Sequence, residues 1–178
     1  MRVSDLSEEK ELKKQGEELA KIAVESRLGA KQLRTIYTLI KTKPLAFVEA
    51  FIQHQLSRVS GTKALEAALE LLRKYEGDKG SFQKIVMYAN MLYDYYERQV
   101  AMKYNPLVEE IAKKICEQQR CKFLGLELST ERDRIEIMVK VSDYRGDPKS
   151  LAYSIGQQIL HRDPKFPGRI WIEKMDRR

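Results

Sequence analysis

"RLGAKQLRTIYTLIKTK", residues 27–43, carries five basic residues and no acidic one. Residues of a helix advance by about 100° each, so its side chains can be projected on a circle. With Lys31 at zero, Arg34 and Lys41 fall within about 80° of it. Four apolar residues fall on the other side, between about 140° and 240°: Leu33, Ile36, Tyr37 and Ile40. The stretch therefore predicts an amphipathic helix that buries one side and presents basic residues on the other.

The positive charge of the chain is concentrated around this helix. The protein has 178 residues and a net charge of +7. Residues 27–63 hold seven basic residues against a single acid, Glu49. This window supplies nearly the whole excess of the chain, so it predicts a localised surface that faces a polyanion. A merely solvated helix face is the alternative interpretation.

The sequence on both sides predicts further helices as far as residue 104. They are expected over residues 8–25, 29–41, 44–59, 63–75 and 81–104. Pro44 separates the second helix from the third. Thr62 is expected to cap the fourth helix, and Ser81 to open the fifth. Helices in series with apolar residues at helical spacing favour a bundle.

The pattern changes after Asn105 and Pro106, where a separate helix over residues 107–119 is predicted. Two runs with the alternation of strands follow, 122–130 and 134–142, joined by a tight turn at 131–133. Asp147 is expected to cap a helix that begins with Pro148, and residues 169–175 form a last strand. The predicted fold class is α plus α+β. A helical bundle of about five helices, residues 1–104, precedes a small αββαβ sandwich, residues 105–178.

The helix predicted over 44–59 also has two distinct sides. The apolar side is expected in the core: Leu45, Val48, Ile52, Leu56 and Val59. Nearly opposite lie Phe47, Phe51, His54 and Arg58. Basic groups beside aromatic rings are an expected way to hold single-stranded nucleic acid, because cations meet phosphates while rings stack on bases. Alternatively, the two phenylalanines fill a second core layer.

Several function classes are not expected. No stretch approaches the roughly 18 apolar residues of a membrane span, and the first residues lack the apolar run of a signal peptide. An intracellular soluble protein is expected. Cys116 and Cys121 are the only cysteines, and their spacing favours reduced structural thiols over a metal site. No phosphate-binding loop, metalloprotease motif or nucleophile elbow occurs, so we expect no enzyme activity, no cofactor and no metal.

Three short motifs in the N-terminal part of the chain resemble those of a known family. Residues 28–35, LGAKQLRT, resemble an L-T-x-x-Q-I-R-K pattern with Gln32 and Arg34 kept. Residues 41–58 loosely match a K-V-x-x-x-Y-Q-x-x-R pattern that ends at Arg58. Residues 77–97 are similar to the last family helix, with Phe82 and Tyr88 in register. In these motifs the chain resembles the small helical subunit of type III-A CRISPR interference complexes, the Csm assemblies.

The chain also departs from this family. Met87 and Asn90 stand where a basic and an acidic residue are expected in the last family helix, so no RNA contact is assigned there. The likeness covers roughly residues 8–104, and residues 105–178 have no counterpart in the compact members. The C-terminal part is therefore a domain of unknown role.

The resemblance implies a noncatalytic, cytoplasmic RNA-binding subunit of a CRISPR effector complex in antiviral defence. Several copies would associate as a filament along guide RNA and target RNA, beside other subunits, and contact backbones without reading sequence. The expected RNA-binding residues are Lys31, Gln32, Arg34, Lys41, Lys43, Arg58 and Lys63. The rival hypothesis is a protein-interaction module: the basic side docks an acidic partner and the C-terminal domain dimerises.

Overall fold

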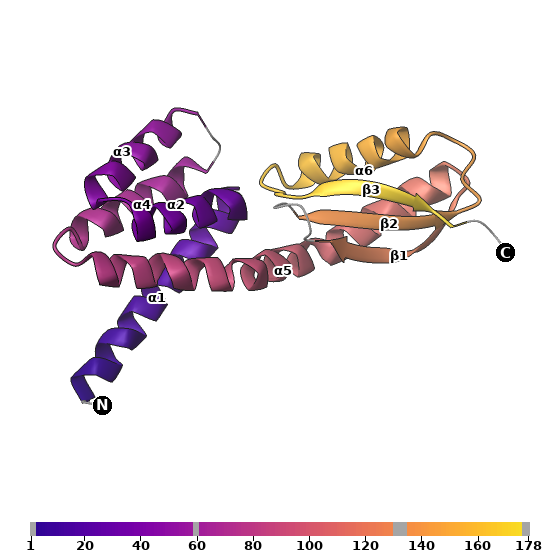
Figure 1. The fold of residues 1–178 in the computed structure, drawn as a ribbon. Coiled ribbons are helices and arrows are strands. Elements are labelled where there is room, and N and C mark those ends of the chain that lie inside the picture. The colour runs from indigo at the N-terminus through magenta and orange to yellow at the C-terminus, as the bar shows by residue number, and fades with distance from the viewer. Residues whose placement is uncertain (1–2, 59–60, 130–134, 176–178) are drawn as a thin grey trace. The chain divides into compact units, whose positions relative to one another are not determined.

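The computed structural model describes residues 3–58, 61–129 and 135–175. Within these residues it contains six helices and a three-stranded sheet (Figure 1). Contacts divide the chain into two compact units, Met1–Tyr96 and Glu97–Arg178, called unit 1 and unit 2 below. The predicted fold class is confirmed, because a helical bundle precedes a small mixed sheet with its own helices.

Unit 1 is an all-helical bundle. Its helices are α1 (Val3–Glu25), α2 (Ala30–Thr42), α3 (Leu45–Leu56), α4 (Thr62–Lys74) and the first part of α5 (Lys79–Gln118). Helix α3 packs against α2 and α4, and α4 packs against α1. The largest fully buried side chains of the unit come from all five helices and include Leu19, Leu33, Ile52, Leu65 and Phe82. Removal of this apolar surface from water is the main force that stabilises the bundle.

Helices α1 and α5 approach each other closely at Gly16. A Cβ atom at Gly16 would lie 2.5 Å from the Cβ of Tyr88 and 2.7 Å from the carbonyl oxygen of Ile85. Atoms cannot approach this closely without a shift of the backbone. Glycine at this position therefore permits the two helices to touch.

Polar side chains reinforce this contact. The hydroxyls of Tyr88 and Tyr96 donate to the carboxylates of Glu9 and Glu17, and Lys84 pairs with Glu9 at 2.7 Å. Hydrogen bonds from Lys84 and then Tyr88 hold the pKa of Glu9 below its ordinary value of 4.5. The hydrogen bond from Tyr96 does the same for the pKa of Glu17.

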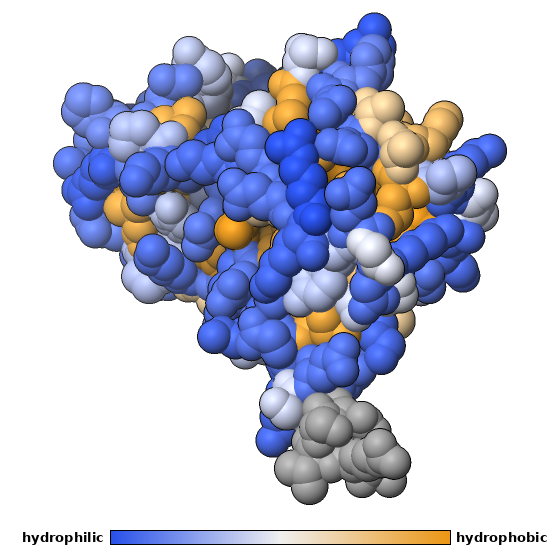
Figure 2. Space-filling view, turned by 90° about the vertical axis from the view of Figure 1, so that its left-hand side faces the viewer, coloured by the Kyte–Doolittle hydropathy of each residue, from blue (hydrophilic) through white to orange (hydrophobic). Residues whose placement is uncertain are grey.

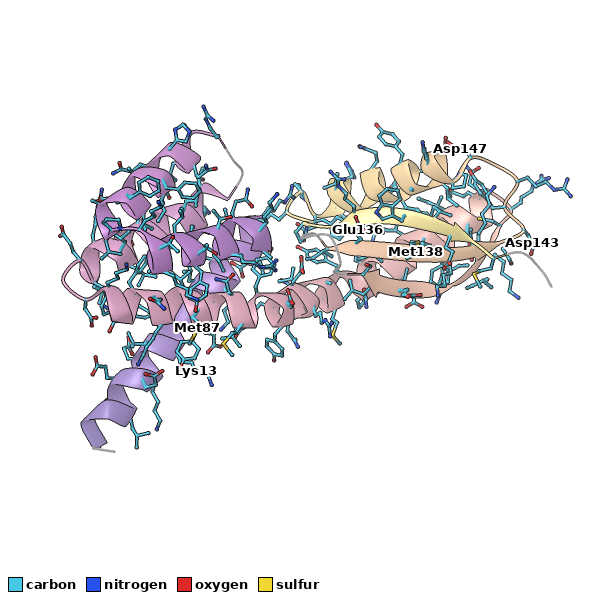
Figure 3. All side chains as sticks on the ribbon, in the orientation of Figure 1. Lys13, Met87, Glu136, Met138, Asp143 and Asp147 are labelled. Atoms are coloured by element: carbon cyan, nitrogen blue, oxygen red, sulfur yellow. The ribbon has the colours of Figure 1, made fainter. Side chains whose placement is uncertain are left out.

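Unit 2 combines the last part of α5 with β1 (Lys122–Ser129), β2 (Glu136–Ser142), α6 (Pro148–Arg162) and β3 (Arg169–Lys174). Strand β1 is antiparallel to β2, and β2 is parallel to β3, which gives the order β1-β2-β3. Ile137, Val139 and Val141 of β2 are buried in one core with residues of α5 and α6. The alternate residues Glu136 and Met138 are half-buried on the other side of the strand (Figure 3).

Residues 107–118 are helical as predicted, but the predicted break before them is wrong, because α5 continues through Pro106. Proline removes one backbone hydrogen bond from a helix interior. Ala101 and Val108, on either side of it, are fully buried in the core of unit 2. Packing on both sides of the proline thus stabilises a helix that local propensity would interrupt.

Two predicted helix starts also differ from the structure. Thr62 is the first residue of α4, and Gly61 precedes it with a φ of 91° and lies so close to Leu28 that a Cβ would be 2.7 Å from that side chain. Ser81 lies in the first turn of α5 and donates its N–H to the carboxylate of Asp78 over 3.1 Å. Several cap-forming residues occur near each start. At α4 the close contact with Leu28 favours glycine at the cap.

Asp147 is confirmed as the cap of α6. Its carboxylate accepts from the N–H groups of Lys149 and Ser150 at 3.3 Å and 3.1 Å (Figure 3). The turn predicted at 131–133, and Val59 of the predicted apolar side, lie outside the described residues. None of the described helices is long and apolar enough to cross a membrane.

Candidate nucleic-acid interface

Helix α2 has the two sides that its sequence predicts. Leu33, Ile36 and Ile40 are buried, with at most 1% of each side chain exposed. Lys31 and Arg34, like Lys41, are exposed. The three cations share one arc of the helix because of their spacing, and we call them the α2 cation row. Figure 2 shows a face of the molecule on which hydrophilic residues predominate.

The α2 cation row is not neutralised by the described part of the chain. None of its members forms an ion pair with any described residue, and the same holds for Lys43, Arg58 and Lys63. Glu49, the one acid of the window, is held by Arg73 of α4 at 3.2 Å. This pair engages the carboxylate with a cation outside the window, so it offsets less of the positive charge of α2.

Gly61 places two further cations near the start of α2. Gly61 lies against the backbone of Leu28, so it is next to the residues that precede α2. Arg58 is three residues before Gly61 and Lys63 two residues after it. A chain of three residues spans at most about 11 Å, so both lie near the same end of α2 as Lys31.

The other end of α2 gathers cations and rings. The ammonium group of Lys41 lies 5.6 Å from the centre of the Tyr37 ring, and that of Lys43 lies 5.8 Å from the centre of the Phe47 ring. Lys79, at the start of α5, donates to the carbonyl oxygen of Lys43 over 3.0 Å. The candidate surface therefore runs along α2, which is about 20 Å long at 1.5 Å per residue.

The residues on the aromatic side of α3 differ in their exposure to solvent. Phe47 is 50% exposed, so it does not belong to a second core layer. Phe51 is half-buried, whereas His54 is exposed like Arg58. Phe47 is thus the aromatic ring that is available to stack on a base beside Lys43.

Not every expected residue joins this surface. Gln32 is half-buried and lies about 100° from Lys31 around α2, outside the arc of the α2 cation row.

Asn90 donates to the carbonyl oxygen of Leu33 over 3.3 Å and to that of Val86 over 2.8 Å. Its amide connects α5 with α2, so its role in this structure is to hold helices together.

Sequence reasoning missed Lys79 and the pairing of Glu49. Lys79 is 36 residues from Lys43, and Arg73 is 24 residues from Glu49. No local pattern links positions at such distances. A signal was present only for Glu49, because a single acid in a basic window invites the question of what neutralises it.

The described residues do not gather three or more histidine, cysteine, aspartate or glutamate side chains in a way that could hold a metal ion. Cys116 is buried, and its burial together with the neighbouring Cys121 raises the pKa of its thiol to about 12. This thiol stays protonated near neutral pH, which makes it a poor nucleophile.

A comparison of the chain with known protein families, with curated proteins and with solved structures found no match. The resemblance to the CRISPR small subunit therefore depends on its short motifs and stays a prediction.

Proposed function

We propose that the protein is a noncatalytic RNA-binding subunit that holds the RNA backbone along α2 of unit 1. The observation that carries the proposal is the α2 cation row, Lys31, Arg34 and Lys41, exposed and without an ion pair among the described residues. Cations in such a position neutralise phosphates and release counterions, which favours binding without a preference for sequence.

The surface favours single-stranded over double-stranded RNA. Phe47 offers half of its side chain to solvent next to Lys43, and rings stack only on bases that are free of a duplex. Lys43, Arg58 and Lys63 extend the surface at the two ends of the α2 cation row. Lys79 adds a cation beside Lys43.

The short motifs of the sequence extend the proposal to a biological setting. In it, the protein is a cytoplasmic structural subunit of a type III-A CRISPR effector complex, and copies of it pack along guide RNA and target RNA beside other subunits. Sequencing of the short RNAs that copurify from the native host tests this setting. Repeat-derived guide sequences are expected, and a random sample of cellular RNA would contradict it.

Fluorescence anisotropy with a labelled oligouridine of 20 nucleotides tests RNA binding directly. If about four phosphates are neutralised, log affinity falls with log salt at a slope near −3. Replacement of the three row residues by alanine should reduce this slope by about 2. An oligoadenine of equal length should bind with similar affinity.

The matched control replaces Lys114, Lys122 and Lys165, which are exposed in unit 2 and form no ion pair with a described residue. This variant loses the same charge and should keep the wild-type slope. Proteins that contact several phosphates lose affinity strongly between roughly 50 mM and 200 mM salt. An RNA affinity that does not change over this range would overturn the proposal. An equal loss in both triple variants would show that net charge, and not the row, binds the RNA.

A further inference from the structure

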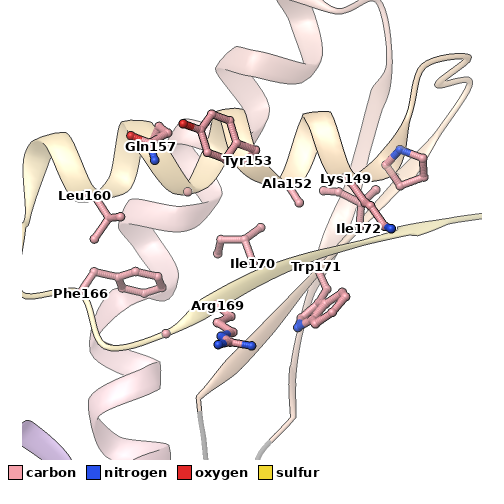
Figure 4. A pocket seen from close by; sticks show the side chains of 13 residues that line it. Lys149, Ala152, Tyr153, Gln157, Leu160, Phe166, Arg169, Ile170, Trp171 and Ile172 are labelled. Carbon is pink, nitrogen blue, oxygen red and sulfur yellow. The ribbon is translucent and has the colours of Figure 1, made fainter. Parts of the chain in front are cut away.

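A groove lies between α6 and β3 in unit 2 (Figure 4). Its volume is about 480 Å³, and apolar side chains from both elements line it. Tyr153 and Leu160 of α6 are 68% and 39% exposed, and Trp171 of β3 is 41% exposed. Ile170 points toward α6, whereas Trp171 and Arg169 point to the other side of the strand. Apolar surface on both sides of one strand is thus left in water.

Strand β3 is an edge of the sheet. It pairs with β2, and no described strand lies on its outer side. The N–H of Arg169 donates to Ile135 and that of Met175 to Val141, both at 2.8 Å. Backbone groups alternate in direction along a strand, so Ile170 and Ile172 direct their N–H and C=O groups outward. Strand β3 has no proline, glycine or bulge that would protect this edge from pairing with another strand.

The sequence of β3, RIWIEK, is complementary to itself when two copies run antiparallel. In the register centred on Trp171, Ile170 of each copy faces Ile172 of the other, and the two tryptophans face each other. Both isoleucines have outward backbone groups, so they form the hydrogen-bonded pairs that an antiparallel ladder requires. Two such pairs supply four hydrogen bonds between the copies.

The charges at the ends of β3 match in the same register. Arg169 of each copy faces Glu173 of the other. Arg169 is exposed and forms no ion pair with a described residue, while the carboxylate of Glu173 has Lys140 of its own chain at 3.7 Å. Opposite charges on directly facing residues stabilise a strand pair, and like charges weaken it.

We propose that a second copy of this chain binds at the outer edge of β3, so that the two sheets join into one continuous sheet of six strands. The twofold axis passes perpendicular to the sheet at Trp171, so both α6 helices lie on the same face of the joined sheet. Tyr153, Leu160 and Ile170 of the two copies then cover one another, and the two tryptophans form an aromatic pair on the other face. The interface is distinct from the α2 surface and does not depend on RNA binding.

Sedimentation velocity of the full chain over roughly 1 to 100 μM, the range in which reversible dimers dissociate, tests the proposal. A concentration-dependent dimer is expected. Trp171 is the only tryptophan of the chain, so its emission should shift to shorter wavelength as the dimer forms. A chain that stays monomeric over this whole range would overturn the proposal. It would do so even if β3 bound an extended segment of an unrelated protein, because the proposed partner is a second copy of this chain.

Ile172→Pro is the sharpest single variant. Its N–H points outward, so proline leaves the β2 to β3 hydrogen bonds intact and removes two of the four bonds between copies. We expect the dissociation constant of the dimer to rise at least about 100-fold. The circular dichroism of the variant should match that of the wild-type chain. A folded variant that still dimerises like the wild type would place the interface elsewhere.

Charge exchange keeps the proposal testable if the proline variant does not fold. Arg169→Glu and Glu173→Arg should each weaken the dimer by roughly tenfold, because like charges then face each other. An equimolar mixture of the two single variants should restore dimerisation, since only opposite charges meet in the mixed pair. A mixture that is no stronger than either variant alone would contradict this register.

Discussion

The cations of α2 in unit 1 and Lys140 in the sheet of unit 2 differ in whether a carboxylate lies beside them. Along α2, exposed cations have no ion-pair partner among the described residues. On the sheet, Lys140 lies between Glu127 and Glu173, with the latter at 3.7 Å. A cation whose field is used within its own chain offers little to an external anion, because nearby opposite charges cancel at a distance. Pairing therefore distinguishes the cations of α2 from Lys140, although composition counts all of them alike.

Charge reversal in the two units should give the largest difference. Lys31→Glu, Arg34→Glu and Lys41→Glu together should lower the affinity for oligouridine at least about 100-fold, because three phosphate contacts become repulsive. The same reversal at Lys114, Lys122 and Lys165 should change affinity by less than about threefold. Fluorescence anisotropy at one fixed salt concentration measures both. Equal losses would show that the position of the cations on α2 does not matter for RNA binding.

Removal of an exposed ring should have the next largest effect. Phe47→Ala is expected to lower RNA affinity about tenfold, since one stacked base contributes roughly 1–3 kcal/mol. Tyr153→Ala, an exposed ring in unit 2, is the matched control and should leave RNA affinity unchanged. Both affinities come from the same anisotropy titration. An unchanged affinity of the Phe47 variant would restrict the interface to backbone phosphates.

Loss of a paired cation should differ from loss of an unpaired one in stability. Lys140→Met leaves two carboxylates on neighbouring strands without the cation between them, so the thermal midpoint should fall, by no more than a few degrees. Lys41→Met should leave the midpoint within about 1 °C of the wild type. Differential scanning calorimetry at low salt measures both, and added salt should narrow the gap. A larger loss for Lys41→Met would mean that the cation on α2 stabilises the fold.

Lowering the pH should have the smallest effect, a loss of stability in the contact between α1 and α5. The folded-state pKa values of Glu9 and Glu17 lie below their ordinary value of 4.5. A carboxylate whose pKa is lowered in the folded state stabilises the protein when the pH is above its ordinary pKa. This stabilisation disappears as the pH falls through the lowered folded-state pKa. The thermal midpoint should therefore decrease from about pH 5 to about pH 3, and less steeply in a Glu9→Gln and Glu17→Gln variant. Parallel curves for variant and wild type would contradict the role of these carboxylates.

The elements with strong periodicity could be predicted from the sequence. Leu33, Ile36 and Ile40 identify the buried side of α2, and Ile137, Val139 and Val141 show the alternation of a half-buried strand. The start and continuation of helices could not be predicted as well. Gly61 replaces Thr62 as the cap of α4 and lies against Leu28, and Pro106 lies inside α5, because contacts with distant residues outweigh local preferences of about 1–3 kcal/mol.

The candidate RNA site could also be predicted from the sequence only in part. The exposure of Lys31, Arg34 and Lys41 follows from their spacing opposite an apolar side. Gln32 was assigned by motif and lies outside the row, since a shift of one residue turns a side chain by about 100°. Phe47 was ambiguous between a core layer and a ligand contact, because periodicity shows which residues share a side and not whether another helix covers that side.

The sequence by itself determined most of the helical and strand segments, the concentration of cations in residues 27–63, and the self-complementary order of charges in β3. These properties depend on residues close together in the chain, whose geometry is set by the helix and strand repeats. Only the tertiary structure decided that Arg73 neutralises Glu49, that Lys79 lies beside Lys43, and that β3 is an edge with an open groove. Such contacts join residues far apart in sequence, and packing of the whole unit, not any local pattern, brings them together.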